Sequence, residues 1–141
     1  MIPYVPRAGD TIFVPHTGGP SGEHLHVVMN DACPEGNHLL VPICSYRPLC
    51  DLTCVLEGGD HIFLNHRSYV SYAKALRYRS DYVSRMVHIG QMRRSDRCRF
   101  DVWERVCQGV LQSDETPEWA INYLKTNWPP ILPAPQNLPN T

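Results

Sequence analysis

The sequence predicts a small, mostly β domain with helices near its C-terminal end. Short β-prone runs separated by turn-forming residues fill the first half of the chain, and an apolar repeat of three and four residues follows residue 96. The length of 141 residues fits one domain, and 43% hydrophobic residues suffice for a core without disulfides or metal. We therefore expect one domain over residues 1–127, built as a small barrel or sandwich. Five prolines predict an extended or disordered tail over residues 128–141, outside the core.

The expected strands lie between clusters of Gly, Pro, Asn and Asp. Each is rich in Val, Ile, Leu, Phe or Tyr and is bounded by residues that favour turns, which is typical of short strands. A loop over residues 16–23, with three glycines and Pro20, joins the first two strands. The six segments are residues 11–14, 24–29, 38–44, 53–56, 61–64 and 68–73.

An amphipathic helix is expected over residues 96–111. Apolar residues recur there at three- and four-residue spacing, so they form one stripe that can seal one side of the barrel. Ser95 or Asp96 can cap its start by accepting a backbone N–H bond. A second helix is predicted next, with Thr116 as its N-cap and Pro117 in its first turn.

The N-terminus and the cysteines predict a cytoplasmic protein with free thiols. The segment Met1–Arg7 has no basic flank followed by an apolar run, so no signal peptide is expected. No apolar stretch approaches the ~18 residues of a membrane helix, and we expect no membrane contact. Because the cytosol keeps thiols reduced, the six cysteines are expected to be free. We expect no cofactor and no metal.

The charge is unevenly distributed along the chain, although the net charge is −1. Residues 1–73 carry three basic and seven acidic residues, residues 74–105 carry nine and four, and residues 106–141 carry one and three. A basic middle segment can attract phosphates. It can equally be a solvated face that pairs with its acidic neighbours.

Several motifs occur in the order typical of one known family. Arg-Ala-Gly-Asp at residues 7–10 precedes the first β run, a glycine-rich loop follows, and the next strand runs into Val-Val-Met-Asn-Asp at residues 27–31. The following strand ends with Val-Pro-Ile-Cys-Ser at residues 41–45, and Ile-Gly-Gln-Met at residues 89–92 precedes the expected helix. In outline, residues 5–112 resemble the PemK/MazF family of toxin-antitoxin toxins.

The resemblance implies a fold and an activity. Members of this family have an SH3-like small β-barrel packed by a C-terminal helix, usually form homodimers, and cleave single-stranded RNA without metal. By resemblance, we expect a toxin-like, metal-independent endoribonuclease with a cognate antitoxin protein as its partner. The alternative is a catalytically degenerate PemK/MazF-like barrel that acts as a protein- or nucleic-acid-binding module.

The family's site residues correspond to positions in this chain. The family has an Arg at the end of the glycine-containing loop and a Thr or Ser closing the Pro-Ile strand, where this sequence has His24 and Cys44. An imidazole can act as acid or base near neutral pH but cannot make the bidentate phosphate contact of Arg. A thiol is a poorer hydrogen-bond donor than a hydroxyl, and Ser45 can compensate for it. The expected catalytic residues are His24, Cys44 and Ser45, and the expected substrate-binding residues are His16, His26 and Arg47.

Three other groupings of reactive residue types stay open. Zinc prefers thiolate and imidazole ligands, although no Cys-x2-Cys knuckle is present. Asp60 and His61 with Ser68 have the residue types of a hydrolase triad, without a nucleophile elbow. Tyrosines interleaved with basic residues over 69–85 can stack bases and hold phosphates, or pack at the barrel rim. The zinc candidates are Cys44, Cys50, Cys54, His61 and His66.

Overall fold

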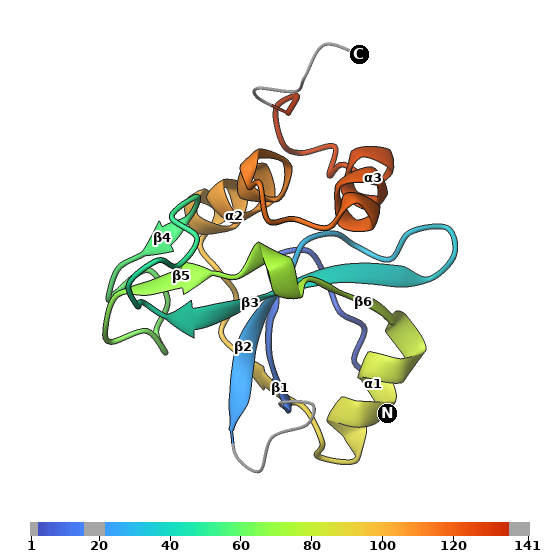
Figure 1. Ribbon diagram of the computed structural model, residues 1–141. Coiled ribbons are helices and arrows are strands. Elements are labelled where there is room, and N and C mark those ends of the chain that lie inside the picture. The colour runs from blue at the N-terminus through green and yellow to red at the C-terminus, as the bar shows by residue number, and fades with distance from the viewer. Residues whose placement is uncertain (1–2, 16–21, 136–141) are drawn as a thin grey trace.

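One antiparallel sheet and three α-helices make up the computed structural model, which describes residues 3–15 and 22–135 (Figure 1). The expectation of a mostly β fold with C-terminal helices is confirmed. His16, one of the expected substrate-binding residues, lies outside the described residues. In chain order the elements are β1 Thr11–Pro15, β2 Glu23–Val28, β3 Asn37–Ser45, β4 Val55–Leu56, β5 Ser68–Val70, the 3-10 turn η1 Tyr72–Lys74, β6 Leu76–Arg79, α1 Ser80–His88, β7 Arg93–Ser95, α2 Phe100–Gln112 and α3 Glu118–Thr126.

The long strand β3 is the centre of the sheet. The strand order is β4-β5-β3-β2-β1-β7, and β6 also pairs with β3. β5 and β6 share one edge of β3, with β5 along residues 43–45 and β6 along residues 37–40. Within the described residues no pairing joins the edge strands β4 and β7, so the sheet is not shown to close. The SH3-like barrel therefore stays a prediction.

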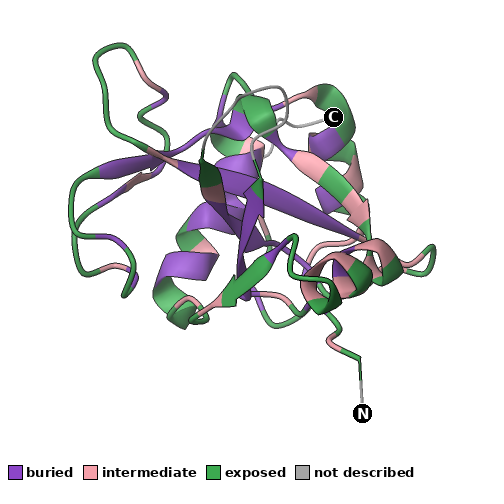
Figure 2. Cartoon of the chain, turned by 90° about the horizontal axis from the view of Figure 1, so that it is seen from below, coloured by how far each residue is buried: buried purple, intermediate pink, exposed green. Residues whose placement is uncertain are grey.

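One face of the sheet is covered by α2 and α3, and we call it the closed face. Because side chains alternate along a strand, every second residue of each strand points to these helices. The indole Nε1 of Trp103 in α2 donates to the Met29 carbonyl at 3.2 Å, which links the helix to the end of β2. Figure 2 shows the central strands of the sheet and much of α2 as buried. The strand residues of the closed face include Phe13, Leu25, Val27, Leu39, Val41, Ile43 and Val70.

A glycine in α2 permits the closest approach between this helix and the sheet. Tyr72, in η1, is fully buried, and its Oη donates to the Val106 carbonyl of α2 at 2.8 Å. A Cβ atom on Gly109 would overlap the ring and the hydroxyl of Tyr72. Gly109 therefore serves close packing rather than a turn.

The opposite face, which we call the open face, has a smaller buried cluster at one end and a cavity at the other. α1 lies beside β6 at one end of this face (Figure 1), and its Val83 packs there together with Met92 on the apolar residues of the sheet. The cavity lies at the other end of this face, where β2 begins and β3 ends, and no residue of α1 lines it. Strand register assigns to this face Ile12, Val14, His24, His26, Val28, Leu40, Pro42, Cys44 and Tyr69.

Several predicted element boundaries are wrong. Residues 61–64 form a turn instead of a strand, in which the Leu64 N–H donates to the His61 carbonyl at 2.9 Å. The strand expected over 53–56 is limited to β4, and the one expected over 68–73 ends at Val70. The elements β6, α1 and β7 were not predicted, because their sequences are rich in Arg and Ser and only Val83 of α1 is fully buried.

Neither expected helix cap is used. α2 begins at Phe100, four residues after Asp96. The Asp96 carbonyl already accepts hydrogen bonds from Thr11 Oγ1 at 2.5 Å and from His61 Nε2 at 2.6 Å, so it is not available to start a helix. Thr116 Oγ1 is buried before α3 and has no hydrogen-bond partner among the described residues.

The first part of the Pro-rich segment packs on the domain. Leu132 is 6% exposed and belongs to the core of the closed face, and Trp128 packs against that core. The Trp128 Nε1 donates to the Pro133 carbonyl at 2.9 Å, which closes a short turn. The packed part of the chain therefore continues past residue 127, although its prolines exclude helix and strand.

Candidate functional site

Three side chains of the open face line up across neighbouring strands. Leu25 of β2 pairs with Ile43 of β3, so the next position in this register sets His24 opposite Cys44. Cys44 pairs in turn with Tyr69 of β5. The row His24, Cys44 and Tyr69 thus crosses β2, β3 and β5 on one face.

This row borders a cavity of about 420 Å³, which we call the cationic cavity. Four of the predicted site residues line it, although they come from two strands and the loop after β3. Its lining contains two cationic side chains and one imidazole but no carboxylate, so it suits an anion. The lining residues are His24, Cys44, Ser45, Tyr46, Arg47, Tyr69 and Lys74.

The buried groups of the cationic cavity stay protonated. Burial raises the pKa of the Cys44 thiol, and the nearby Lys74 and Arg47 offset this rise only in part. Burial likewise raises the pKa of the Tyr69 phenol, and Cys44 adds to the rise. At neutral pH both residues are therefore neutral hydrogen-bond donors rather than anions.

His26 has a different environment from His24. It lines an adjoining cavity of about 330 Å³ that shares His24 and Lys74 with the cationic cavity. Its Nδ1 donates to the His24 carbonyl at 2.9 Å, and burial lowers its pKa to about 4. His26 is consequently uncharged at neutral pH, and its hydrogen bond fixes the position of the backbone at His24.

A polar relay lies beside the cavity at the ends of β3 and β5. Ser45 Oγ is 3.0 Å from His66 Nε2, and His66 Nδ1 is 2.7 Å from Asn65 Oδ1. All three residues are exposed. His66 was only a zinc candidate in the sequence, because nothing in a single sequence relates it to a serine 21 residues away.

Three residues of the cavity, Tyr46, Tyr69 and Lys74, were not among the predicted site residues. Lys74 ends η1, where its backbone N–H donates to the Ser71 carbonyl at 3.1 Å. It is the first basic residue of the segment 74–105, and that was the available signal. Tyr69 was noted only as one of several interleaved tyrosines.

The basic segment is mostly paired with acidic neighbours. Five of its nine basic residues form ion pairs through exposed guanidinium groups, although Asp10 and Asp60 on the other side are largely buried. Arg77 and Arg94 lie over the rings of Trp119 and Tyr4. The pairs are Arg79–Asp81, Arg93–Glu23, Arg97–Asp10, Arg99–Asp60 and Arg105–Asp60, and Arg99 also pairs with Asp101.

The other sets of reactive residues considered from the sequence do not come together in the structure as sites. In the ranges 3–15 and 22–135, no three His, Cys, Asp or Glu side chains are placed to hold a metal ion. His61 is occupied by Thr11 and Asp96, and Ser68 Oγ donates to the His66 carbonyl, so no Asp60-His61-Ser68 triad forms. Among the tyrosines, Tyr72 is fully buried and cannot stack a base.

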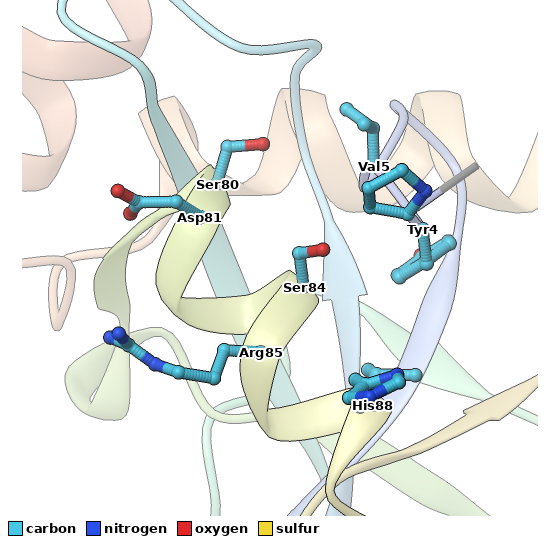
Figure 3. A pocket seen from close by; sticks show the side chains of 9 residues that line it. Tyr4, Val5, Ser80, Asp81, Ser84, Arg85 and His88 are labelled. Atoms are coloured by element: carbon cyan, nitrogen blue, oxygen red, sulfur yellow. The ribbon is translucent and has the colours of Figure 1, made fainter. Parts of the chain in front are cut away.

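A larger cavity of about 840 Å³ lies between the N-terminal segment and α1 (Figure 3). Its walls include Tyr4 and Val5 on one side and Ser84, Arg85 and His88 on the other. None of the predicted site residues lines it, and its Asp81 and Arg85 have opposite charges. The cationic cavity therefore remains the candidate site.

Comparisons with known proteins do not assign a family. No model of a protein family matches the chain, and no curated protein matches it. The resemblance to PemK/MazF toxins therefore rests on the motifs quoted above. All six cysteines are free, and no helix formed by the described residues is long and apolar enough to cross a membrane.

Proposed function

We propose that the protein is a toxin-like, metal-independent endoribonuclease that cleaves single-stranded RNA in the cationic cavity. The observation that carries this proposal is the convergence of Arg47, Lys74 and His24 on one cavity without a carboxylate. Two cations suit a phosphodiester, and an imidazole can exchange a proton near neutral pH. The proposal includes the homodimer and the cognate antitoxin of the family that the sequence resembles.

The reaction is an internal transfer within the RNA. The ribose 2′-OH attacks the neighbouring phosphorus, the P–O5′ bond breaks, and the products carry a 2′,3′-cyclic phosphate and a 5′-hydroxyl. One group takes the proton of the 2′-OH and another supplies a proton to the leaving 5′-oxygen. His24 performs one of these two transfers.

The remaining residues of the cavity stabilise the phosphate. Arg47 and Lys74 offset the negative charge that grows on the phosphate oxygens, and the hydroxyl of Tyr69 donates a hydrogen bond to them. Cys44 stays a thiol and contributes a weaker donor. None of these roles requires a metal ion.

The test is cleavage of an unstructured, end-labelled RNA by the purified protein in EDTA. We expect fragments with 2′,3′-cyclic phosphate ends, and an oligonucleotide with a 2′-deoxyribose at the cleaved position should resist. His24→Ala should lower the rate by about 100-fold or more. His88→Ala, which removes an exposed histidine from α1, is the matched control. Absence of cleavage, or cleavage unchanged by His24→Ala, contradicts the proposal.

The second candidate is a degenerate barrel that binds protein or nucleic acid without cleaving it. The observation that favours it is the presence of His24 and Cys44 where the family has Arg and Thr. In this case the protein should bind single-stranded RNA with an affinity that falls as salt rises, and Lys74→Ala should weaken binding. The bound RNA should stay intact, whereas the first candidate requires its cleavage.

A further inference from the structure

The ladder between β3 and β5 brings Ser45 and His66 together. Ser45 pairs with Ser68, and the Tyr46 N–H donates to the Arg67 carbonyl at 3.1 Å, so the ladder continues one residue past Ser45. His66 is two residues before Ser68 and therefore lies on the same side of the strand as Ser68 and Ser45. The 3.0 Å contact between Ser45 Oγ and His66 Nε2 follows from this register.

The hydrogen bonds determine which nitrogen of His66 carries the proton. The amide oxygen of Asn65 can only accept, so His66 Nδ1 donates to it across 2.7 Å. In a neutral imidazole, Nε2 then holds the lone pair and accepts the hydroxyl proton of Ser45. A serine, a base and a group that orients the base are the parts of an activated nucleophile.

The loop that carries Asn65 and His66 is anchored on both sides. Leu64 before it is 6% exposed and Ser68 after it is 1% exposed. The Leu64 carbonyl accepts from the Gly59 N–H at 3.1 Å, and Ser68 Oγ donates to the His66 carbonyl at 3.3 Å. Both ends of this loop are therefore fixed by buried residues, while Asn65, His66 and Ser45 are exposed to solvent, where a substrate can reach them.

We propose that Ser45 is the nucleophile of an acyl-transfer activity, with His66 as its general base and Asn65 as a positioning residue, acting on small esters. Ser45 pairs with Ser68, so its side chain points to the opposite side of β3 from Cys44 and Tyr69, and the ester approaches from solvent at the exposed end of this strand. This activity goes beyond RNA cleavage, in which the nucleophile belongs to the substrate.

The reaction proceeds in two balanced steps. Ser45 Oγ attacks the carbonyl carbon while its proton passes to His66 Nε2, and the ester C–O bond then breaks as the alcohol leaves with that proton. Water next attacks the acyl-serine with His66 again as base, which releases the acid and restores the hydroxyl.

The experiment uses one chromogenic ester, 4-nitrophenyl butyrate, on the full-length protein. We expect a burst of nitrophenolate and a mass increase of one butyryl group located on Ser45. Ser45→Ala should abolish the label, and both His66→Ala and His66→Gln should slow acylation by about 100-fold or more.

Asn65 acts through His66, so its role is tested by the pH dependence of the acylation rate. Asn65→Ala should slow acylation, whereas Asn65→Asp keeps an acceptor and adds a negative charge that favours the protonated imidazole. Asn65→Asp should therefore shift the rate–pH profile to higher pH. If Asn65 only stabilises the loop, the profile does not move, and its positioning role is wrong.

Matched controls and a parallel RNA assay separate the possible outcomes. Ser84→Ala and His88→Ala, both on α1, should leave acylation unchanged. The proposal is overturned by an absence of label, by a label on Cys44 or Lys74 instead of Ser45, or by His66 variants that react at the wild-type rate. RNA cleavage without acylation overturns this inference alone, and acylation without RNA cleavage overturns only the endoribonuclease.

Discussion

The closed face and the open face of the same sheet differ in what covers them. On the closed face, α2 and α3 bury an apolar layer, and the polar atoms of Trp103 and Tyr72 donate to main-chain carbonyls. On the open face, α1 covers one end only, and His24, Cys44 and Lys74 reach a cavity. Strand alternation therefore places the cavity residues on the open face, although this face also has a buried apolar cluster near α1. Substitutions at the cavity should change activity, whereas substitutions in either buried layer should change stability.

The largest loss of stability is expected at the contact between α2 and Tyr72. Gly109→Ala gains about 1 kcal/mol of helix propensity. The new methyl group overlaps a fully buried ring that a hydrogen bond to Val106 holds in place, and such overpacking costs up to about 3 kcal/mol or more. We expect a net decrease in the free energy of unfolding of about 2–3 kcal/mol in urea denaturation. If the overlap is the cause, combining Gly109→Ala with Tyr72→Phe should cost less than the sum of the two single changes.

His26 tests the comparison because it is a buried residue of the open face. Its pKa is lowered to about 4 in the folded chain against an ordinary value of 6.5. The unfolded chain therefore takes up the proton first, and stability that is complete above pH 6.5 is lost as the pH falls towards 4. At about 1.4 kcal/mol per pKa unit, the loss is at most about 3.5 kcal/mol.

Replacement of His26 should remove this part of the pH dependence. In urea denaturation between pH 7.5 and 4.5, His26→Asn should show a smaller loss of stability than the wild type. Some loss remains because burial also lowers the pKa of His38. His88→Asn, at an exposed position, is the control and should follow the wild type. An equal slope for His26→Asn and the wild type would show that His26 is not buried in the neutral form.

The Pro-rich segment should contribute to the stability of the closed face. Leu132→Ala removes a side chain that is 6% exposed, and we expect a decrease in the free energy of unfolding of about 2 kcal/mol. Ile131→Ala, at a neighbouring residue that is 70% exposed, should change it by less than about 0.5 kcal/mol. Equal effects of the two substitutions would place Leu132 outside the core.

Lys74 should have the smallest effect on stability and a clear effect on function. Its side chain is exposed in η1 and lines the cationic cavity, so Lys74→Ala should change the free energy of unfolding by less than about 0.5 kcal/mol. The same substitution should weaken RNA binding and lower the cleavage rate, because one of two cations is lost. Lys125→Ala, at an exposed lysine of α3, should change neither property.

Local sequence patterns predicted the elements that bury one whole face. The runs at 11–14, 24–29 and 38–44 became β1, β2 and β3, and the apolar repeat after residue 96 became α2. These segments are buried along a whole face, so their composition carries a strong signal. α1 was not predicted although the partly buried Tyr82, Met86 and Val87 pack beside Val83, because its Arg and Ser content obscures this apolar face. The composition of residues 61–64 favours a strand. In the structure His61 makes hydrogen bonds with Thr11 and Asp96, which are distant in sequence, and these hold the segment as a turn.

The sequence by itself determined that the chain forms a β-rich domain with C-terminal helices, and it placed His24, Cys44, Ser45 and Arg47 among the candidate residues. Their convergence depends on strand register and on the position of the loop after β3, which no local pattern contains. Only the tertiary structure brought Lys74 to this cavity and His66 to Ser45. The physical reason is that a cavity and a relay are made by side chains far apart in the chain, whereas composition and periodicity report only on neighbours.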